Sequence, residues 1–177
     1  MSDPLWYFAY GSNMHPATLC GRRGIVAQRA VAACLTGWQL VLDKPPLLLI
    51  GEAMANIVTE PAARVLGVAY AITAEDLAHL DLTEGVLIGN YDRIVVRVAA
   101  LDGSGVMFDA FTLTSPHRDP TLRPSRRYMA LLIEGAQMHG LAAEYVAWLR
   151  AHPAGEESPE AVAMRTLVDQ VLKREPR

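Results

Sequence analysis

The sequence has few of the features that mark secreted or membrane-bound proteins. Its 177 residues contain two cysteines, Cys20 and Cys34, which are too few for a disulfide framework or a four-cysteine zinc site. The first residues lack the charged and apolar segments of a signal peptide. No apolar run approaches the roughly 20 residues that span a bilayer. These absences predict a soluble, cytoplasmic protein with no membrane partner.

Common cofactor and nucleophile motifs are also missing. The chain has no phosphate-binding loop, dinucleotide fingerprint, His-Glu-x-x-His pair, Cys-x-x-Cys pair or Gly-x-Ser-x-Gly elbow. The formal net charge is −3, and the clusters Arg22-Arg23 and Arg123/Arg126/Arg127 are too small to form a phosphate-tracking stripe. We therefore expect no metal and no nucleic-acid partner, and we place these arginines on a solvated surface.

What is present predicts one packed α+β domain over residues 1–177. Hydrophobic residues make up 51% of the chain and charged residues 20%, which favours a packed globule over disorder. Strand-like segments fill the first two-thirds, and helical ones the last third. The expected strands are Leu5–Tyr10, Val31–Leu42, Met54–Thr59, Val65–Ile72, Tyr91–Leu101 and Val106–Thr114.

Four helices are expected around these strands. The first follows the N-cap Thr73 and ends at Gly85, where a glycine suits the left-handed conformation. Two more run from Pro124-Ser125 to about Met138 and from Leu141 to His152. A terminal helix over about residues 159–174, opened by Ser158-Pro159, forms a C-terminal extension of the domain.

Gly11-Ser12-Asn13 follows an aromatic, strand-like segment that ends at Tyr10. Glycine permits a close approach of a ligand to the backbone, and successive N–H groups in such a loop can bind an anion. The loop therefore suits a carboxylate, or an oxyanion developing on a carbonyl group. The alternative interpretation is an ordinary turn.

Glu84 is the acid that the sequence sets apart. It ends the short helix and precedes Gly85, so its carboxylate faces the negative end of the helix dipole. That position disfavours the anion and favours a role as a proton acceptor. The alternative is a solvent-facing glutamate paired with an arginine.

Three motifs in this order resemble the gamma-glutamylcyclotransferase family. They are Tyr10-Gly11-Ser12-Asn13-Met14, then Leu80-Asp81-Leu82-Thr83-Glu84-Gly85 with Gly89-Asn90-Tyr91, and the C-terminal run from Pro124-Ser125 through Gly135-Ala136 to Gly140-Leu141 and Glu144-Tyr145. The resemblance covers about residues 5–155. It implies a small, closed or partly closed β-barrel of about six strands, flanked by helices, with a cavity at one end.

The resemblance also implies a site and a reaction. Gly11, Ser12 and Asn13 would bind a γ-glutamyl group through backbone N–H donors, Tyr10 would position the loop, and Glu84 would be the general base. Tyr91 and Tyr128 match aromatic positions near the pocket, where they either contact substrate or bond the backbone with their hydroxyls.

The implied enzyme is an acyltransferase or lyase. The α-amino group of a small γ-glutamyl amide attacks its own γ-carbonyl and releases 5-oxoproline without a cofactor. A non-catalytic barrel that binds an amino-acid-like or carboxylate ligand is the alternative. The protein is expected to be a monomer or homodimer.

The segment before the third expected strand departs from the family. Animal members carry a Gly-Gly-Ile-Ala-Thr-like stretch where this chain has Ala53-Met54-Ala55-Asn56-Ile57, preceded by the apolar run Leu47–Ile50. This run is either buried or forms a pocket wall or dimer contact. The segment can shape the leaving-group side of the pocket, so the group attached to the γ-glutamyl moiety stays open.

Overall fold

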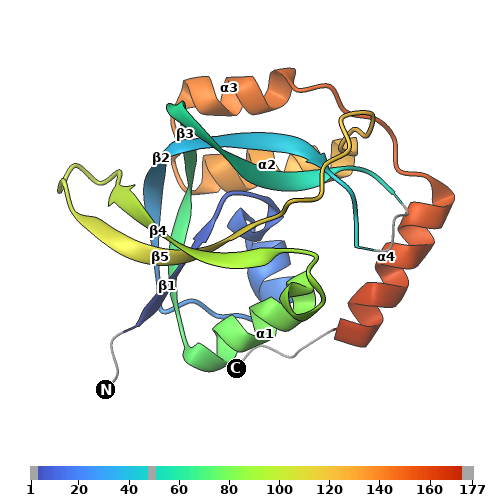
Figure 1. Cartoon of the computed structure of the whole chain (residues 1–177), viewed down its shortest axis with the longest axis horizontal. Coiled ribbons are helices and arrows are strands. Elements are labelled where there is room, and N and C mark those ends of the chain that lie inside the picture. The colour runs from blue at the N-terminus through green and yellow to red at the C-terminus, as the bar shows by residue number, and fades with distance from the viewer. Residues whose placement is uncertain (1–3, 48–50, 173–177) are drawn as a thin grey trace.

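Five strands close into a barrel in the computed structural model, which describes residues 4–47 and 51–172 (Figure 1). The strands are β1 (Leu5–Ala9), β2 (Arg29–Lys44), β3 (Met54–Ile72), β4 (Asp92–Ala100) and β5 (Met107–Thr114). Their order around the barrel is β1-β3-β2-β4-β5. All neighbours are antiparallel except β1 and β5, which pair in parallel at Tyr7 and Phe111 and close the ring.

The expected α+β barrel is confirmed, with five strands in place of about six. The two expected strands Met54–Thr59 and Val65–Ile72 are parts of the single strand β3, which contains Pro61. Thr36 pairs with Arg64 and Trp38 with Thr59, so residues 60–63 lie opposite Gly37 alone. Proline has no N–H to donate, and this irregular stretch accommodates it without breaking the strand.

Both faces of the second half of β3 are buried. Val65, Val68 and Ile72 are fully buried and pack in the same core as Phe8 of β1. At Gly67, a Cβ atom would lie 2.3 Å from the carbonyl oxygen of Ala9. The glycine therefore allows β1 to approach β3 closely at the point where the chain leaves β1 for the Gly-Ser-Asn loop.

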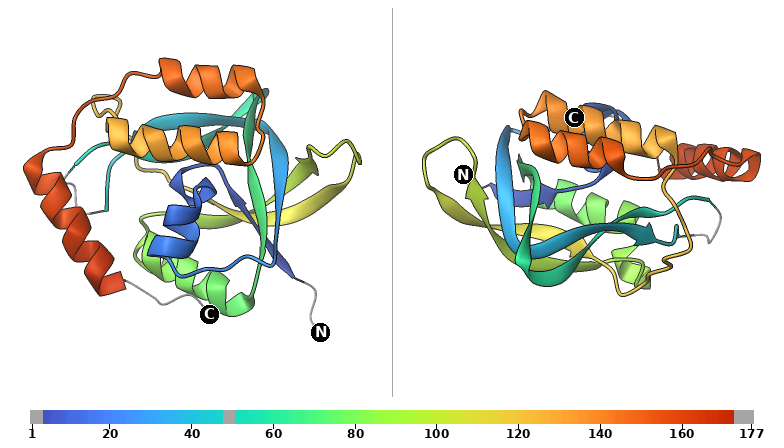
Figure 2. Two further views of the ribbon diagram at one scale, coloured as in Figure 1. Left: turned by 180° about the vertical axis from the view of Figure 1, so that it is seen from behind. Right: turned by 90° about the horizontal axis from the view of Figure 1, so that it is seen from above.

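The helices lie on different sides of the barrel. Figure 2 shows α2 (Arg126–Met138) and α3 (Ala143–Ala151) together against one side, with α1 (Ala74–Glu84) away from them. In the same views α4 (Pro159–Leu172) stands beside the barrel. Within the described residues, no helix is both long and apolar enough to cross a membrane.

Local chemistry fixes both ends of α1. The Thr73 hydroxyl accepts a hydrogen bond from the Asp76 backbone N–H at 3.1 Å, and the Asp76 carboxylate accepts one from the Thr73 backbone N–H. This reciprocal pair is a capping box, which starts the helix. Gly85 ends it in the left-handed conformation, with φ at 72°. Glu84 is thereby the last residue of α1, as the sequence predicts. The short turn η3 (Val86–Ile88) follows.

The loop after β1 packs against α2. It forms two short helical turns, η1 (Ser12–Met14) and η2 (Ala17–Arg22). At Gly135 of α2, a Cβ atom would lie 2.9 Å from the Met14 Cβ. The glycine therefore allows α2 to pack closely against η1, and this packing holds the Gly-Ser-Asn loop in place.

Candidate active site

All of the predicted site residues line one pocket at the mouth of the barrel. The loop after β1, the end of α1, the start of β4 and the start of α2 converge there and bring together Tyr10, Gly11, Ser12, Asn13, Glu84, Tyr91 and Tyr128. The structure thus places these residues side by side, although they come from distant parts of the chain. Their roles stay predictions.

Glu84 lies at the centre of a charged network. Its Oε1 accepts a hydrogen bond from Asn13 Nδ2 at 2.9 Å and lies 2.5 Å from Arg23 Nη2. Arg23 Nε donates to Asn13 Oδ1 at 2.9 Å, and Asn13 Nδ2 also donates to the Tyr7 hydroxyl at 3.0 Å. Both of these contacts to the carboxylate are made to Oε1. Asn13 therefore orients the acid as well as belonging to the loop.

Arg23 corrects the prediction that Arg22-Arg23 is solvated surface. It is 6% exposed, and its guanidinium is held between Asn13 and Glu84. The alternative interpretation of Glu84 was a solvent-facing glutamate paired with an arginine. Glu84 does pair with an arginine, but the pair lies inside the pocket. Arg22 also lines the pocket and pairs with Asp169 of α4. In the second arginine cluster, Arg126 pairs with Glu156 at the surface, whereas Arg127 lines the pocket.

Two tyrosines bond the backbone of Ala55 on β3. The Tyr91 hydroxyl donates to the Ala55 carbonyl at 2.8 Å, and the Tyr128 hydroxyl accepts from the Ala55 N–H at 3.0 Å. Both hydroxyls are thus tied to backbone, as one interpretation held, and both rings still line the pocket. Tyr10 donates to the Leu113 carbonyl at 2.6 Å, which ties the Gly-Ser-Asn loop to β5.

The pocket tyrosines stay protonated at neutral pH. Burial raises the pKa of Tyr7, Tyr10 and Tyr91 well above the ordinary value, and the negative charge of Glu84 raises each further. Burial also raises the pKa of Tyr128 to about 12, although hydrogen bonds from Ala55 and Ser12 oppose that shift. These phenols therefore act as hydrogen-bonding groups at neutral pH.

The Gly-Ser-Asn loop is closely fitted around the Tyr128 hydroxyl. A Cβ atom on Gly11 would lie 3.3 Å from that oxygen and 3.2 Å from the Ala55 Cβ. Ser12 approaches the same hydroxyl with its side chain and its backbone N–H. Gly11 and Ser12 therefore lie against Tyr128 in the pocket.

Lys44 is a pocket residue that sequence reasoning missed. It ends β2, is 1% exposed, and its ammonium donates to the Pro45 carbonyl at 2.7 Å and to Asn90 Oδ1 at 2.6 Å. The ammonium also lies 4.5 Å from the centre of the Tyr91 ring. Burial lowers the pKa of Lys44 to about 8, and the attraction of Glu84 partly opposes this. A lysine that ends an apolar strand just before Pro45-Pro46 was the available signal.

Helix α4 forms the outer wall of the pocket. Ala161, Met164, Arg165 and Val168 line the pocket from this helix, and Glu157 pairs with Arg127 at 3.4 Å and with Arg165 at 3.1 Å. Leu47 also lines the pocket and is 39% exposed, which favours the pocket-wall interpretation for this residue. Residues 48–50 of that apolar run lie outside the described part of the chain.

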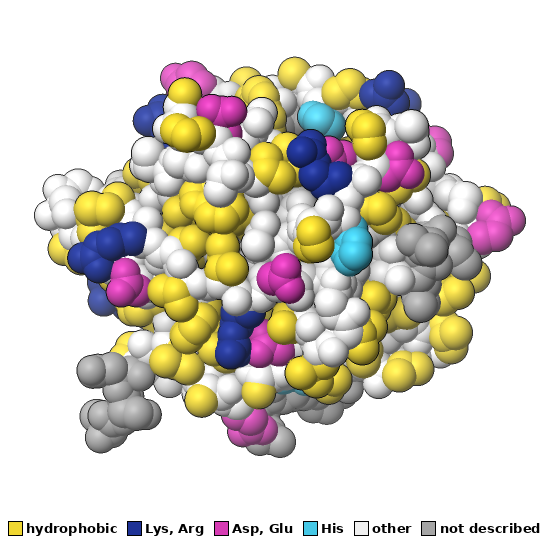
Figure 3. All heavy atoms as spheres, viewed as in Figure 1, with side chains coloured by type: hydrophobic (Ala, Val, Ile, Leu, Met, Phe, Trp, Pro, Cys, Tyr) yellow, Lys and Arg dark blue, Asp and Glu magenta, His cyan; other side chains and the backbone are white. Residues whose placement is uncertain are grey.

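The surface charges do not form a basic stripe on the face in Figure 3. Lys and Arg side chains there alternate with acidic and apolar ones. Among residues 4–47 and 51–172, no group of three or more His, Cys, Asp or Glu side chains has an arrangement that could hold a metal ion.

Comparisons with known proteins cover most of the chain. Residues 64–149 match the AIG2-like family. A gamma-glutamylcyclotransferase of Homo sapiens is 32% identical over 149 residues, which cover 82% of this chain and 77% of the human protein. The gamma-glutamyl cyclotransferase aclK of Aspergillus oryzae is 31% identical over 174 residues, and the match covers 84% of this chain but 62% of the fungal protein. A solved structure titled gamma-glutamyl cyclotransferase is similar with a TM-score of 0.75 at 25% identity, covering 93% of this chain and 99% of that one.

Proposed function

Because this chain belongs to the gamma-glutamylcyclotransferase family, we propose that it releases 5-oxoproline from a γ-glutamyl compound. The observation that carries the proposal is the position of Glu84. Its carboxylate faces a pocket that also contains the N–H groups of the Gly-Ser-Asn loop. A proton acceptor and a set of backbone donors in one pocket are the two parts that an intramolecular acyl transfer requires.

The chemistry begins with the α-ammonium of the bound γ-glutamyl group. Oε2 of Glu84 takes a proton from this ammonium, and the free amine attacks the γ-carbonyl carbon. A C–N bond forms and the carbonyl oxygen becomes an oxyanion. Glu84 passes its proton to the leaving nitrogen, and the bond to that nitrogen breaks as the oxyanion forms the carbonyl again. The ring nitrogen loses its second proton to the released amine, which departs as an ammonium. The products are 5-oxoproline and an amine or amino acid.

The pocket supplies position and charge for this reaction. The attack is already intramolecular, so a main task of the site is to hold the glutamyl chain in the folded conformer. We assign that task to the backbone of Gly11–Asn13, which Tyr10 and Tyr128 hold in place. The Arg23 guanidinium holds the Glu84 carboxylate at Oε1, and we assign the proton transfer to Oε2.

One observation favours a second function, a barrel that binds an amino-acid-like ligand without turning it over. Arg23 compensates the charge of Glu84, so the acid does not simply repel a bound carboxylate. Calorimetric binding of γ-glutamyl compounds with no 5-oxoproline formed would support this alternative.

The variant Glu84→Gln tests the assignment of the base. The amide keeps the size of the side chain but cannot accept the ammonium proton, so the rate of 5-oxoproline release should fall by about 10²- to 10⁴-fold. Mass spectrometry of 5-oxoproline measures the rate.

Asp81→Asn is a matched control. It makes the same carboxylate-to-amide change in the same helix, at a residue that pairs with Arg93 and does not line the pocket. Release that survives in Glu84→Gln at the rate of this control would refute the role of Glu84.

A further inference from the structure

The side-chain amide of Asn13 has its orientation fixed by its partners. Its Oδ1 accepts a hydrogen bond from Arg23 Nε at 2.9 Å, and a guanidinium group has only donors. Nδ2 therefore lies on the other side, where it donates one hydrogen to Glu84 Oε1 at 2.9 Å and one to the Tyr7 hydroxyl at 3.0 Å. The two N–H bonds of one amide thus connect the proposed base to a tyrosine.

The Tyr7 hydroxyl is the acceptor in this bond, so its own proton is left to be donated elsewhere. Tyr10, Tyr70 and Tyr91 behave differently, because each of their buried hydroxyls donates to a backbone carbonyl, at 2.6, 2.9 and 2.8 Å. Among residues 4–47 and 51–172, the hydrogen bonds of the Tyr7 hydroxyl include no acceptor for its proton. A ligand in the pocket can supply that acceptor.

The surroundings of Tyr7 favour an acceptor with a negative charge. Its side chain is 4% exposed and lines the pocket. Leaving a buried donor without a partner costs about 1 to 3 kcal/mol. Burial and the negative charge of Glu84 raise the pKa of Tyr7, so the phenol keeps its proton at neutral pH. A hydrogen bond from such a donor is strongest when the acceptor oxygen is charged.

The proposed reaction produces a charged oxygen in this part of the pocket. The amine that loses its proton to Glu84 must lie about 3 to 3.5 Å from the γ-carbonyl carbon in order to attack it. The γ-carbonyl group is therefore brought next to Glu84, where Asn13 also holds the Tyr7 hydroxyl. Its oxygen becomes negative only as the C–N bond forms, so a donor at this place stabilises the transition state more than the bound substrate.

We infer that the Tyr7 hydroxyl donates a hydrogen bond to the oxyanion that forms on the γ-carbonyl group, which makes Tyr7 a second catalytic residue beside Glu84. The inference rests on the proposed function and deepens it. Tyr7 undergoes no covalent change, because the phenol keeps its proton throughout. The hydrogen bond strengthens as charge develops on the substrate oxygen and weakens when the carbonyl forms again.

The variant Tyr7→Phe removes the hydroxyl and retains the ring. With γ-glutamylalanine as the probe, kcat and kcat/KM for 5-oxoproline release should fall together by about 10²- to 10³-fold, because the lost interaction is made in the transition state. Tyr145→Phe is the matched control. It makes the same change at a tyrosine of α3 that packs against the core and is not among the lining residues of the pocket, and it should leave both constants unchanged.

A fluorinated tyrosine separates catalysis from a structural role. Tyr7 also accepts from Asn13, so Tyr7→Phe could act only by releasing Asn13 and, through it, Glu84. Site-specific 3-fluorotyrosine at residue 7 retains the hydroxyl and makes it a stronger donor but a weaker acceptor. The single-turnover rate of 5-oxoproline formation should therefore rise if Tyr7 donates to the oxyanion, and fall if it serves only as the acceptor for Asn13.

The pH profile tests the remaining destination of the proton, the Glu84 carboxylate. If Tyr7 donated there, Tyr7→Phe would remove a bond that favours the charged carboxylate and would move the acidic limb of kcat/KM to higher pH. We expect the limb to stay in place. A shifted limb, a loss confined to KM, a loss of less than about tenfold in kcat, or a slower reaction with 3-fluorotyrosine would each overturn the inference. Absence of 5-oxoproline from γ-glutamyl amino acids and amines with the unmodified protein would instead refute the proposed function.

Discussion

Replacing Arg23 by methionine tests whether the buried ion pair holds the pocket together. Methionine keeps much of the apolar volume of arginine, so the change removes mainly the contacts to Glu84 and Asn13. The side chains of Arg23 and Glu84 are 8% and 15% exposed, so water cannot readily replace the guanidinium. Loss of one partner from a buried pair costs about 3 to 5 kcal/mol, because the other charge is left uncompensated. For a chain of this length, that cost lowers the melting temperature by about 6 to 20 °C.

A double-mutant cycle separates the pair from its surroundings. In the Glu84→Gln background the carboxylate charge is already gone and Arg23 is itself uncompensated, so removing Arg23 should cost about 1 kcal/mol or less. The coupling free energy should therefore be at least about 2 kcal/mol, measured by urea unfolding of the four proteins. Additive effects of the two changes would refute the claim that the ion pair stabilises the fold.

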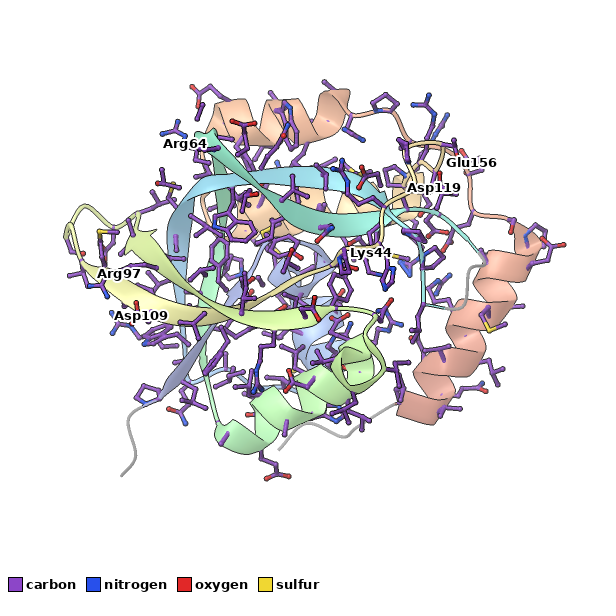
Figure 4. The ribbon with its side chains drawn as sticks, in the orientation of Figure 1. Lys44, Arg64, Arg97, Asp109, Asp119 and Glu156 are labelled. Atoms are coloured by element: carbon purple, nitrogen blue, oxygen red, sulfur yellow. The ribbon has the colours of Figure 1, made fainter. Side chains whose placement is uncertain are left out.

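An exposed ion pair supplies the control for this cycle. Arg97 and Asp109 pair across the β4–β5 hairpin at 2.9 Å, with 60% and 64% of their side chains exposed (Figure 4). Such pairs contribute about 1 kcal/mol or less, because solvent screens them. Arg97→Met should therefore leave the free energy of unfolding nearly unchanged.

Two further predictions concern the fold around the site. Gly67→Ala should destabilise the protein by about 3 kcal/mol or more, because the new Cβ would lie 2.3 Å from the Ala9 carbonyl oxygen and 2.8 Å from the Phe8 ring. Denaturant unfolding measures the loss of stability. A neutral effect would show that β1 and β3 can move apart. Thr73→Ala removes the side-chain cap of α1 and should cost about 1 kcal/mol by the same measurement, whereas Thr73→Ser, which retains the hydroxyl, should restore most of it.

The sequence predicts those elements that local chemistry decides. Helix α1 lies where the Thr73 cap and the Gly85 terminus place it, because both signals act within one turn. The prediction of two separate strands, Met54–Thr59 and Val65–Ile72, is wrong for a non-local reason. Gly37 of β2 lies opposite the irregular stretch, and a register shift between two distant strands is not visible in either one.

The candidate site likewise combines residues that the sequence predicts with residues whose contribution depends on distant parts of the chain. The Gly-Ser-Asn loop and Glu84 carry recognisable motifs, and the structure brings them together at 2.9 Å through Asn13. The contributions of Arg23 and Lys44 were missed, because each depends on residues far along the chain that decide whether its charge is buried. Helix α4 was predicted as an extension, but nothing in its own sequence indicates that it lines the pocket.

The bonds to Ala55 have a consequence for the edge of β3 that faces the pocket. Residues 55–57 of β3 pair with β2 on one side only, and on the other side Tyr91, Tyr128 and Thr114 occupy the positions where a neighbouring strand would donate and accept. An open sheet edge of this kind is a template for pairing with another chain. Tyr91 and Tyr128 therefore pair this edge of β3 from within the pocket, and their removal would leave the Ala55 N–H and carbonyl unpaired at the same place where it damages the site.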